Sequence, residues 1–287
     1  MNLGFVGLGH LGRAIAERLL DCGHSLAVWN RTPGKAQGLG VSETASLYEL
    51  THSTEIIFAC LFDSKAVREV LTRQDGLLSG DVAGKIVVDV TTNHFRDVLA
   101  FHDLCKEAGC QYLEAPVLGS VVPASQGALT VLISGEKTAF EKARSVLEDV
   151  GKHLFYLSEP GLATKMKLIN NLTLGSFMAT IAEALVLGEE IGLAKKKVLD
   201  ILSAGGGNSL VLNAKKNALL TEDFTTQFSN ALIYKDLHCL QDLAYERQIP
   251  IFMAALSKEL YAKACSAGRA QDDFSSIFSV LRQERTR

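Results

Sequence analysis

The sequence predicts an α/β Rossmann-like N-terminal domain and an all-α C-terminal domain, joined by a long interdomain helix. Two observations predict this arrangement. Up to about Leu157, short β-rich runs alternate with amphipathic helical stretches, which is the pattern of βαβ units on a parallel sheet. After Gly161 the β signal fades and apolar residues recur at helical spacing. We therefore expect one domain over residues 1–160 and an all-helical domain over residues 161–287.

The strand candidates are mostly continuous apolar runs, as expected for strands that helices cover on both faces. They comprise Leu3 to Gly7, Ser25 to Asn30, Glu55 to Cys60, Lys85 to Val90, Gln111 to Glu114, Leu129 to Ser134 and His153 to Leu157. Ser134, Gly135 and Glu136 follow the sixth run and are interpreted as a helix cap. They are not a nucleophile elbow, because the GxSxG pattern is absent from the sequence.

The helices of the second half begin with a long one. Glu159, Pro160 and Gly161 supply a break and a start for a helix that runs to about Gly192 and connects the two domains. Further helices are expected over Val198 to Leu202, Leu210 to Leu220, Phe228 to Arg247 and Phe252 to Ala267. Three glycines at 205–207 separate two of them, with Asn208 as a plausible N-cap.

Composition and charge exclude several classes of protein. With 287 residues and 47% hydrophobic residues, the chain can bury two cores. The formal charge of −3 provides no basic field for a phosphate backbone, so we expect no nucleic-acid partner. The longest apolar stretch, Leu172 to Gly188, contains Ser176, Thr180 and Glu183, which favours a buried or interface helix over a membrane span. A small polar ligand remains the best expectation.

The cysteines and histidines indicate neither a metal site nor a disulfide framework. The six cysteines lack CxxC spacing, and the seven histidines form no HxxxH set. We therefore expect reduced, mostly buried thiols and no metal. The N-terminus leads directly into an apolar strand without a basic region before it, so we expect no signal peptide and a cytoplasmic location.

A glycine-rich turn follows the first strand candidate and opens a helix. Residues 7–12 read GLGHLG, which is the GxGxxG pattern in its strand–turn–helix context. The first glycine permits the tight turn, the second lets the backbone approach a pyrophosphate, and the third lets helix and strand pack closely. The alternative is a βα turn without a ligand. The dinucleotide interpretation assigns cofactor binding to Gly7, Leu8, Gly9, His10 and Leu11.

The end of the second strand indicates which dinucleotide is bound. Enzymes that prefer NAD place an acidic residue there to hold the ribose 2′-hydroxyl, and this chain has none. Arg31, with Asn30 and Thr32, instead offers a guanidinium fork and a hydroxyl suited to a 2′-phosphate. This favours NADP over NAD. A solvated turn arginine is the alternative.

Five segments of the chain resemble motifs of the β-hydroxyacid dehydrogenase family, and the similarity covers nearly the whole sequence. That family includes 3-hydroxyisobutyrate dehydrogenase, tartronate semialdehyde reductase and the glyoxylate/succinic semialdehyde reductases. The segments are Phe5 to Gly12, Asn30 to Thr32, Glu114 to Gly119, Lys167 to Asn171 and Lys235 to Leu237. In the first of them, Leu11 stands where the family usually has methionine.

The resemblance implies that Lys167 is the catalytic, proton-transferring residue beside a nicotinamide. Lys167 and Asn171 are four residues apart on the predicted long helix and so share one face, where both can reach one substrate oxygen. Lys165, two residues earlier, points elsewhere. A solvated interdomain lysine and a helix-bending asparagine are the alternative. We expect the active site in the crevice between the two domains.

The resemblance also implies roles for residues in the other segments. Additional cofactor contacts are expected from Leu61, Phe62, Thr92 and Lys235. The substrate is expected to contact Leu118, Gly119, Ser120, Asn171 and Asp236. Ordinary core leucines, a strand-capping threonine and a surface pair of Lys235 with Asp236 are the alternative interpretations.

One departure from the family pattern concerns the substrate. The family's motif normally carries a serine where this chain has Leu118, so its hydroxyl is missing. Its part in binding the substrate carboxylate falls to the backbone N–H groups of Gly119 and Ser120, to the Ser120 hydroxyl, or to another substrate group. We therefore expect a substrate preference shifted from that of the commonest family members.

These observations predict an NADP-dependent reductase or dehydrogenase that interconverts a short carboxylate-bearing semialdehyde and its hydroxy acid. A homodimer or homotetramer without a membrane partner is expected. Two alternatives remain: an imine reductase of the same architecture, which usually carries another residue in place of Lys167, and a catalytically inactive, dehydrogenase-like binding protein.

Overall fold

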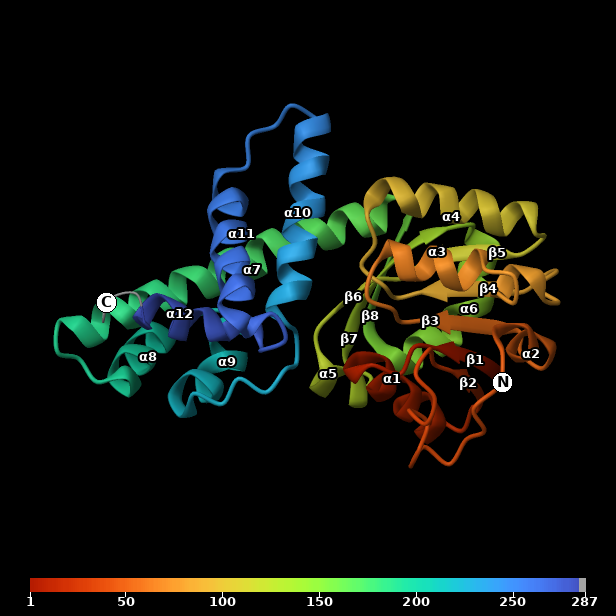
Figure 1. Cartoon of the computed structure of the whole chain (residues 1–287), viewed down its shortest axis with the longest axis horizontal. Coiled ribbons are helices and arrows are strands. Elements are labelled where there is room, and N and C mark those ends of the chain that lie inside the picture. The colour runs from red at the N-terminus through yellow and green to blue at the C-terminus, as the bar shows by residue number, and fades with distance from the viewer. Residues whose placement is uncertain (284–287) are drawn as a thin grey trace. The chain divides into compact units, whose positions relative to one another are not determined.

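The computed structural model describes residues 1–283, which fold into two compact units (Figure 1). The first unit ends at Lys167 and the second begins at Leu168, so the division lies inside the long helix α7 (Leu162–Glu190).

The first unit is built on an eight-stranded sheet with the order β2-β1-β3-β4-β5-β7-β6, and β8 pairs with β7. The strands are β1 (Asn2–Val6), β2 (Ser25–Trp29), β3 (Ile56–Ala59), β4 (Ile86–Asp89), β5 (Gln111–Glu114), β6 (Val117–Leu118), β7 (Leu129–Gly135) and β8 (Gly151–Ser158). All seven predicted strands are present. The short strand β6 was not predicted, because two residues cannot display a periodicity.

The prediction of a parallel sheet is correct for β1 to β5 and wrong for the strands that follow. Strand β7 runs antiparallel to both β5 and β6, while β8 runs parallel to β7. A parallel neighbour requires a crossover connection, usually through a helix. The segment between β5 and β7 is instead occupied by β6 and the short helix α5 (Val121–Ser125), and the chain direction reverses there.

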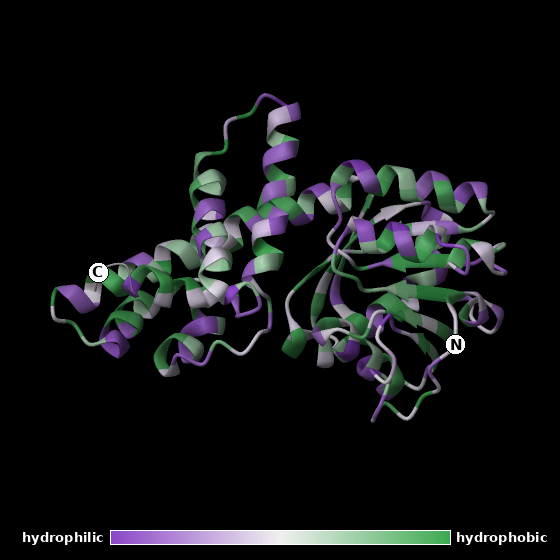
Figure 2. Ribbon diagram, viewed as in Figure 1, coloured by the Kyte–Doolittle hydropathy of each residue, from purple (hydrophilic) through white to green (hydrophobic). Residues whose placement is uncertain are grey.

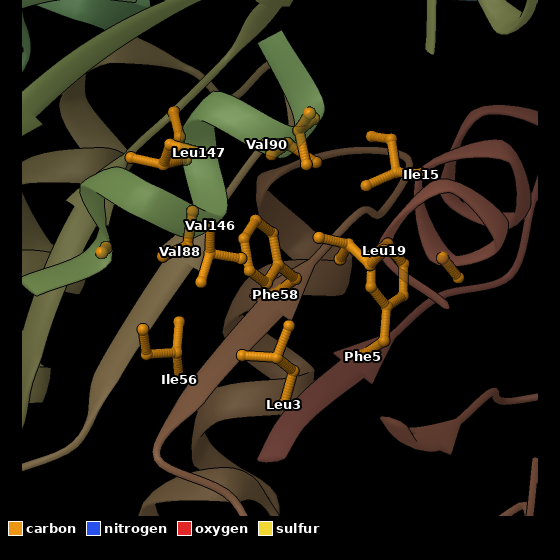
Figure 3. Packing of buried hydrophobic residues seen from close by; sticks show 14 of the residues in the cluster. Leu3, Phe5, Ile15, Leu19, Ile56, Phe58, Val88, Val90, Val146 and Leu147 are labelled. Carbon is orange, nitrogen blue, oxygen red and sulfur yellow. The ribbon is translucent and has the colours of Figure 1, made fainter. Parts of the chain in front are cut away.

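Helices cover both faces of this sheet and enclose two apolar cores. They are α1 (His10–Asp21), α2 (Leu47–His52), α3 (Ser64–Thr72), α4 (Phe95–Glu107) and α6 (Lys137–Val150), with a 3-10 turn η1 (Leu77–Ser79). Figure 3 shows one core, where Phe5 and Phe58 meet Ile15 of α1 and Val146 of α6. Successive residues of a strand point to opposite faces of the sheet. Val6 and Ile57, the neighbours of Phe5 and Phe58, therefore belong to the opposite core with residues of α3 and α4. The predicted Rossmann-like architecture is confirmed.

The second unit is helical throughout the part that the structure describes. After α7 come α8 (Lys195–Ala204), α9 (Leu210–Thr221), α10 (Asn230–Glu246), α11 (Phe252–Ala264), the π-helical turn η2 (Cys265–Arg269), the 3-10 turn η3 (Phe274–Ser276) and α12 (Ile277–Gln283). The all-helical prediction is confirmed, but α12 was not predicted. The predicted N-cap was wrong by one residue, since Ser209 and not Asn208 caps α9, accepting from the Leu212 N–H at 3.0 Å.

Helix α7 is long and apolar enough to cross a membrane by length and composition alone. It has 29 residues, and 44% of its most apolar stretch is buried inside the protein. The buried core helix of a soluble protein meets the same criterion, so this test does not distinguish the two. Figure 2 shows hydrophobic and polar residues alternating along the helical unit, whereas the strands of the first unit are predominantly hydrophobic.

All six cysteines lie within the described residues and are free thiols. Cys105, Cys110 and Cys239 are buried, and the other three are half-buried. Three of the six cysteines are therefore buried, where the sequence predicted that most of them would be.

Candidate active site

The three glycines of the turn after β1 have different structural duties. A Cβ on Gly7, whose φ is +97°, would lie 2.3 Å from the Cys60 carbonyl oxygen, and a Cβ on Gly12 would lie 2.1 Å from the Gly7 carbonyl oxygen. Both positions therefore require glycine for packing. At Gly9, by contrast, a Cβ would have no described atom within 4 Å. Gly9 thus borders open space.

The open space at Gly9 lies at the start of α1. Gly9 is the N-cap residue, and no side chain of the described chain caps the helix there. The first turn carries no acidic residue that would oppose an anion. Its backbone N–H groups and the positive end of the helix dipole are therefore available to a negatively charged group. The site fits the pyrophosphate of a dinucleotide.

Asn30 holds this turn against the end of β2. Its Oδ1 accepts a hydrogen bond from the Leu8 N–H at 2.8 Å, and its Nδ2 donates to the Thr32 carbonyl at 2.8 Å. The side chain is therefore used for positioning the glycine turn, while Arg31 and Thr32 are exposed. The sequence predicts that Asn30, with Arg31 and Thr32, receives the 2′-phosphate, whereas in the structure its side chain binds the backbone of the turn.

Arg13, in the first turns of α1, fixes the loop that follows β2. Its guanidinium donates to the carbonyl oxygens of Lys35 and Gln37 at 3.1 Å and pairs with Glu17 at 2.9 Å. Arg13 was not predicted as a positioning residue, because the two carbonyl oxygens that it binds lie 22 and 24 residues away and follow no motif.

A buried hydrogen-bond network ties the ends of β3 and β4 together. The Thr91 hydroxyl oxygen accepts from the Leu61 N–H at 2.9 Å, and the Thr91 N–H donates to Asp89 at 2.9 Å. Asp89 also accepts from the Tyr112 hydroxyl at 2.5 Å and from the Asn93 amide at 2.7 Å. Burial raises the pKa of Asp89 and outweighs these hydrogen bonds, which lower it.

This network positions two segments predicted to contact the cofactor. Leu61 and Phe62 lie just after β3, and Thr92 lies just after β4, next to the residues of this network. Leu61 and Thr92 are half-buried, and Phe62 is 49% exposed. In an open α/β sheet this carboxyl edge is where ligands bind.

The segment after β5 contains the predicted substrate contacts of the first unit. Leu118, in β6, is half-buried, and Gly119 is exposed with a φ of +127°. Ser120 is the N-cap residue of α5, but its hydroxyl makes no capping hydrogen bond there. The Ser120 hydroxyl is therefore not used as a helix cap.

Glu114, at the end of β5, is bonded to the first turn of α7. Its side chain is 1% exposed, and its Oε2 accepts from the N–H and the hydroxyl of Thr164 at 3.0 and 2.7 Å. Oε1 accepts a short hydrogen bond from the Gly161 N–H and lies 3.1 Å from Nε2 of His102. Burial alone would raise the pKa of Glu114, but the hydrogen bonds from His102, Thr164 and Gly161 outweigh it and lower the pKa.

Ser134 has a different partner from the one predicted. It lies in β7, and its hydroxyl oxygen accepts from the Ala163 N–H in α7 at 3.0 Å, so it does not cap α6, the helix that follows it in sequence. The N-cap residue of α6 is Glu136, which makes no side-chain cap. Of the three residues interpreted as a helix cap, Glu136 is the N-cap residue of α6, whereas the Ser134 hydroxyl binds the start of α7.

Lys167 lies one turn after Thr164 and is buried, with 7% of its surface exposed. Lys165 is half-buried, and a helical step of two residues directs it away from Lys167. A buried lysine is uncommon and marks a candidate functional group.

In the second unit, Asn171 and Asp236 are bonded to each other. The Asn171 amide donates to Asp236 Oδ2 at 2.6 Å, and both side chains are at most 1% exposed. The Lys235 ammonium lies 2.8 Å from Asp236 Oδ1, although this contact lacks hydrogen-bond geometry. Asp236 therefore orients Asn171.

Over residues 1–283 the structure contains no group of three or more His, Cys, Asp or Glu side chains arranged to hold a metal ion.

Comparisons with known proteins identify the family. Residues 2–158 match the NAD-binding domain of 6-phosphogluconate dehydrogenase, and residues 161–281 match the NAD-binding domain of NADP-dependent 3-hydroxyisobutyrate dehydrogenase. The chloroplastic glyoxylate/succinic semialdehyde reductase 2 of Arabidopsis thaliana is 33% identical over 100% of this chain and 81% of its own length. The chain belongs to the β-hydroxyacid dehydrogenase family. It is an NAD(P)-binding member, as both matched domains show.

Several solved structures share the fold of this chain. A 3-hydroxyisobutyrate dehydrogenase from Salmonella typhimurium has a TM-score of 0.91 at 26% identity and covers 98% of this chain and 99% of its own. A structure described as Psf3 in complex with NADP+ and 2-OPP has a TM-score of 0.90 at 29% identity, covering 97% and 99%. An imine reductase from Pseudomonas sp. matches at 22% identity with a TM-score of 0.67, over 98% of this chain and 99% of its own, and shares the fold alone.

Another relative has a different description. The human protein called cytokine-like nuclear factor N-PAC is 36% identical over 96% of this chain, but the chain spans only 51% of its length. The chain is therefore similar both to a reductase and to part of a larger protein that is named as a nuclear factor.

Proposed function

We propose that the chain is an NADP-dependent oxidoreductase that interconverts a short carboxylate-bearing aldehyde and its hydroxy acid, with Lys167 as general acid and base. The observation that carries this proposal is the burial of Lys167 in α7, one helical turn before the buried Asn171. A buried lysine whose pKa can be tuned by its surroundings is suited to proton transfer. Family membership supports the reaction class.

The first unit supplies the cofactor site in this proposal. Gly9 and the uncapped start of α1 receive the pyrophosphate, and Arg31 pairs with the 2′-phosphate that distinguishes NADP from NAD. The match to an NADP-dependent dehydrogenase and the neighbour solved with NADP+ both support this choice. When bound, the nicotinamide supplies hydride chemistry.

Lys167 supplies the proton chemistry. In reduction its ammonium polarises the carbonyl and protonates the oxygen of the developing alkoxide, and in oxidation the neutral amine removes the hydroxyl proton. Asn171 follows Lys167 by four residues on the same helix, which places the two side chains on successive turns of one face. Asn171 is held by Asp236, so its amide is oriented before substrate binds.

The substrate class rests on the segment around Leu118. Gly119 and Ser120 offer backbone N–H groups and one hydroxyl for a carboxylate, while Leu118 replaces the serine that the family pattern expects. The similar Arabidopsis protein is named for glyoxylate and succinic semialdehyde, so both are natural candidates. We expect Leu118 to narrow the pocket and to favour a less polar substrate than that of a serine-containing relative.

The experiment that tests the function compares Lys167→Ala with Lys165→Ala. NADPH oxidation is followed with glyoxylate, succinic semialdehyde, tartronate semialdehyde and methylmalonate semialdehyde. Loss of the general acid should lower kcat about 100-fold or more with the preferred substrate, because such groups contribute factors of about 10² to 10⁴. Lys165→Ala, on the same helix and two residues away, should retain most of the activity.

Three other outcomes would indicate a different catalytic group or a different function. Turnover that survives Lys167→Ala would remove the proposed role of this lysine. NADPH-dependent turnover of cyclic imines without turnover of the four aldehydes would indicate an imine reductase. Tight NADPH binding with no turnover of either class would indicate a binding protein, as the likeness to a protein named as a nuclear factor allows.

The Leu118→Ser variant tests the substrate argument separately. Restoring the hydroxyl should change the relative kcat/KM values across the four aldehydes by about tenfold, since a well-placed hydrogen bond or a change of pocket volume contributes about 1–3 kcal/mol. If the order and ratios of the four substrates stay as they are in the unmodified protein, Leu118 does not set the preference.

A further inference from the structure

We propose that Glu114 is the positioning residue for Lys167, acting as a carboxylate clamp on the first turn of α7. The inference rests on the proposed function in one respect only, namely that Lys167 transfers the proton. The clamp itself is a property of the fold, and it can be tested without any catalytic measurement.

Helix α7 begins at the surface of the sheet, and side chains from two strands bind its first N–H groups. Glu114 at the end of β5 accepts from the N–H groups of Gly161 and Thr164 through its two oxygens. Ser134 in β7 accepts from the Ala163 N–H, which lies between them. The N–H groups that a helix start leaves without partners are therefore bonded to fixed points on the sheet.

These contacts fix the rotation of α7 about its axis and the position of its first turn relative to the sheet. A single capping residue leaves the helix free to turn about its axis. Here acceptors on two strands, and the additional hydrogen bond from the Thr164 hydroxyl at 2.7 Å, prevent this rotation. Thr164 is one turn before Lys167, so the direction of the lysine follows from this constraint. All of these residues belong to the first compact unit.

The charge of Glu114 makes the clamp stronger than a neutral cap. A buried carboxylate at a helix start is stabilised by the helix dipole and by charge-assisted hydrogen bonds. The ionisable groups facing it are His102 from α4 and Tyr112 within β5. The hydrogen bonds that lower the pKa of Glu114 keep it ionised at neutral pH.

Glu136 provides a matched control within the same unit. It is also a glutamate at the start of a helix, α6, but its side chain makes no capping hydrogen bond. Glu136→Gln therefore changes the same atoms without breaking a clamp. Glu114→Gln keeps the shape of the side chain but turns an amide N–H₂ toward an N–H donor of α7, so at least one of the two backbone bonds is lost.

The test measures hydrogen exchange and kinetics on the same variants of the full chain. In Glu114→Gln, the amides of Gly161, Ala163 and Thr164 should exchange about tenfold faster or more, while Glu136→Gln leaves them unchanged. The kcat should fall about tenfold or more, since small misplacements of a catalytic group have effects of that size, and the Kd for NADPH should stay within about twofold. Thr164→Val, which removes only the hydroxyl bond, should give a smaller change in the same direction and serves if Glu114→Gln folds poorly.

The outcomes separate the clamp from the proposed function. Unchanged exchange and unchanged kcat in Glu114→Gln would overturn the clamp, whatever Lys167 does. Faster exchange with unchanged kcat would overturn the positioning role. If Lys167→Ala is fully active while Glu114→Gln still accelerates exchange at the helix start, the proposed function fails and the clamp remains as a structural feature. A parallel loss of kcat and NADPH affinity would show a general structural defect and would also contradict positioning.

Discussion

Asn30 and Arg31 are adjacent single residues at the end of β2, and their side chains have different functions. Asn30 is committed to the Leu8 N–H and the Thr32 carbonyl, so it shapes the glycine turn. Arg31 is exposed beside it and can meet a ligand without breaking an internal contact. Discrimination between the two dinucleotides should therefore depend on Arg31 far more than on Asn30.

Arg31→Ala should raise the Kd for NADPH about tenfold to a hundredfold and leave the Kd for NADH nearly unchanged. A hydrogen bond between charged groups contributes about 1.5–3 kcal/mol, and only NADPH carries the 2′-phosphate. Fluorescence titration with both nucleotides measures the two constants. Arg144→Ala, which removes an exposed arginine of α6 paired with Glu148, is the control. Equal weakening of both nucleotides would contradict the assignment.

At the scale of one element, the turn from β1 into α1 combines two kinds of glycine. Close contacts between backbone segments require glycine at positions 7 and 12, whereas at position 9 no atom of the described residues would meet a Cβ. Packing therefore explains the first and third glycines of the motif, while the second is explained only by a ligand that approaches the backbone.

Substitutions at two of these glycines should separate stability from binding. Gly9→Ala should change the free energy of unfolding by less than about 0.5 kcal/mol but weaken NADPH binding about tenfold or more, because the methyl group enters the pyrophosphate space. Gly12→Ala should cost about 2 kcal/mol or more of stability, since its Cβ would lie 2.1 Å from the Gly7 carbonyl oxygen. Urea unfolding and nucleotide titration give the two quantities. Full NADPH affinity in a folded Gly9→Ala variant would argue against the proposed pyrophosphate site.

At the scale of the whole molecule, each unit has its own means of joining distant elements. In the first unit, Glu114 and Ser134 connect the sheet to α7. In the second, Glu222 at the end of α9 receives Lys195 from α8 at 2.6 Å and Arg282 from α12 at 2.8 Å. Side-chain hydrogen bonds from Arg282 and Lys195 lower the pKa of Glu222 from 4.5 to about 2.

Glu222 should therefore contribute stability that depends on pH. Because its pKa in the folded state is lowered, the contribution is present above the unfolded value of 4.5 and is lost as the pH falls toward about 2. The side chain is 35% exposed, so solvent screening reduces the effect to about 1 kcal/mol. Glu222→Gln should be less stable at pH 7 by that amount, and its stability should approach that of the unmodified protein near pH 2. Thermal unfolding between pH 7 and pH 2 measures the difference, and a difference that does not vary with pH would contradict this account.

Most of the elements and all of the motifs could be recognised in the sequence. Apolar periodicity and turn residues are local, so every predicted strand formed, the second half folded as helices, and the glycine turn took its place between β1 and α1. The family also followed from short segments whose residue order is visible in the chain.

The partners of these elements became visible only in the folded chain. Ser134 lies in a segment interpreted as a helix cap, yet its hydroxyl binds the start of α7. Glu114 binds residues 47 and 50 positions away. The reversal of β7 was equally invisible in the local pattern, because strand direction depends on how the chain returns to the sheet. Hydrogen-bond partners far apart in sequence are selected by packing and by the need to satisfy every buried polar group, and neither has a local signature.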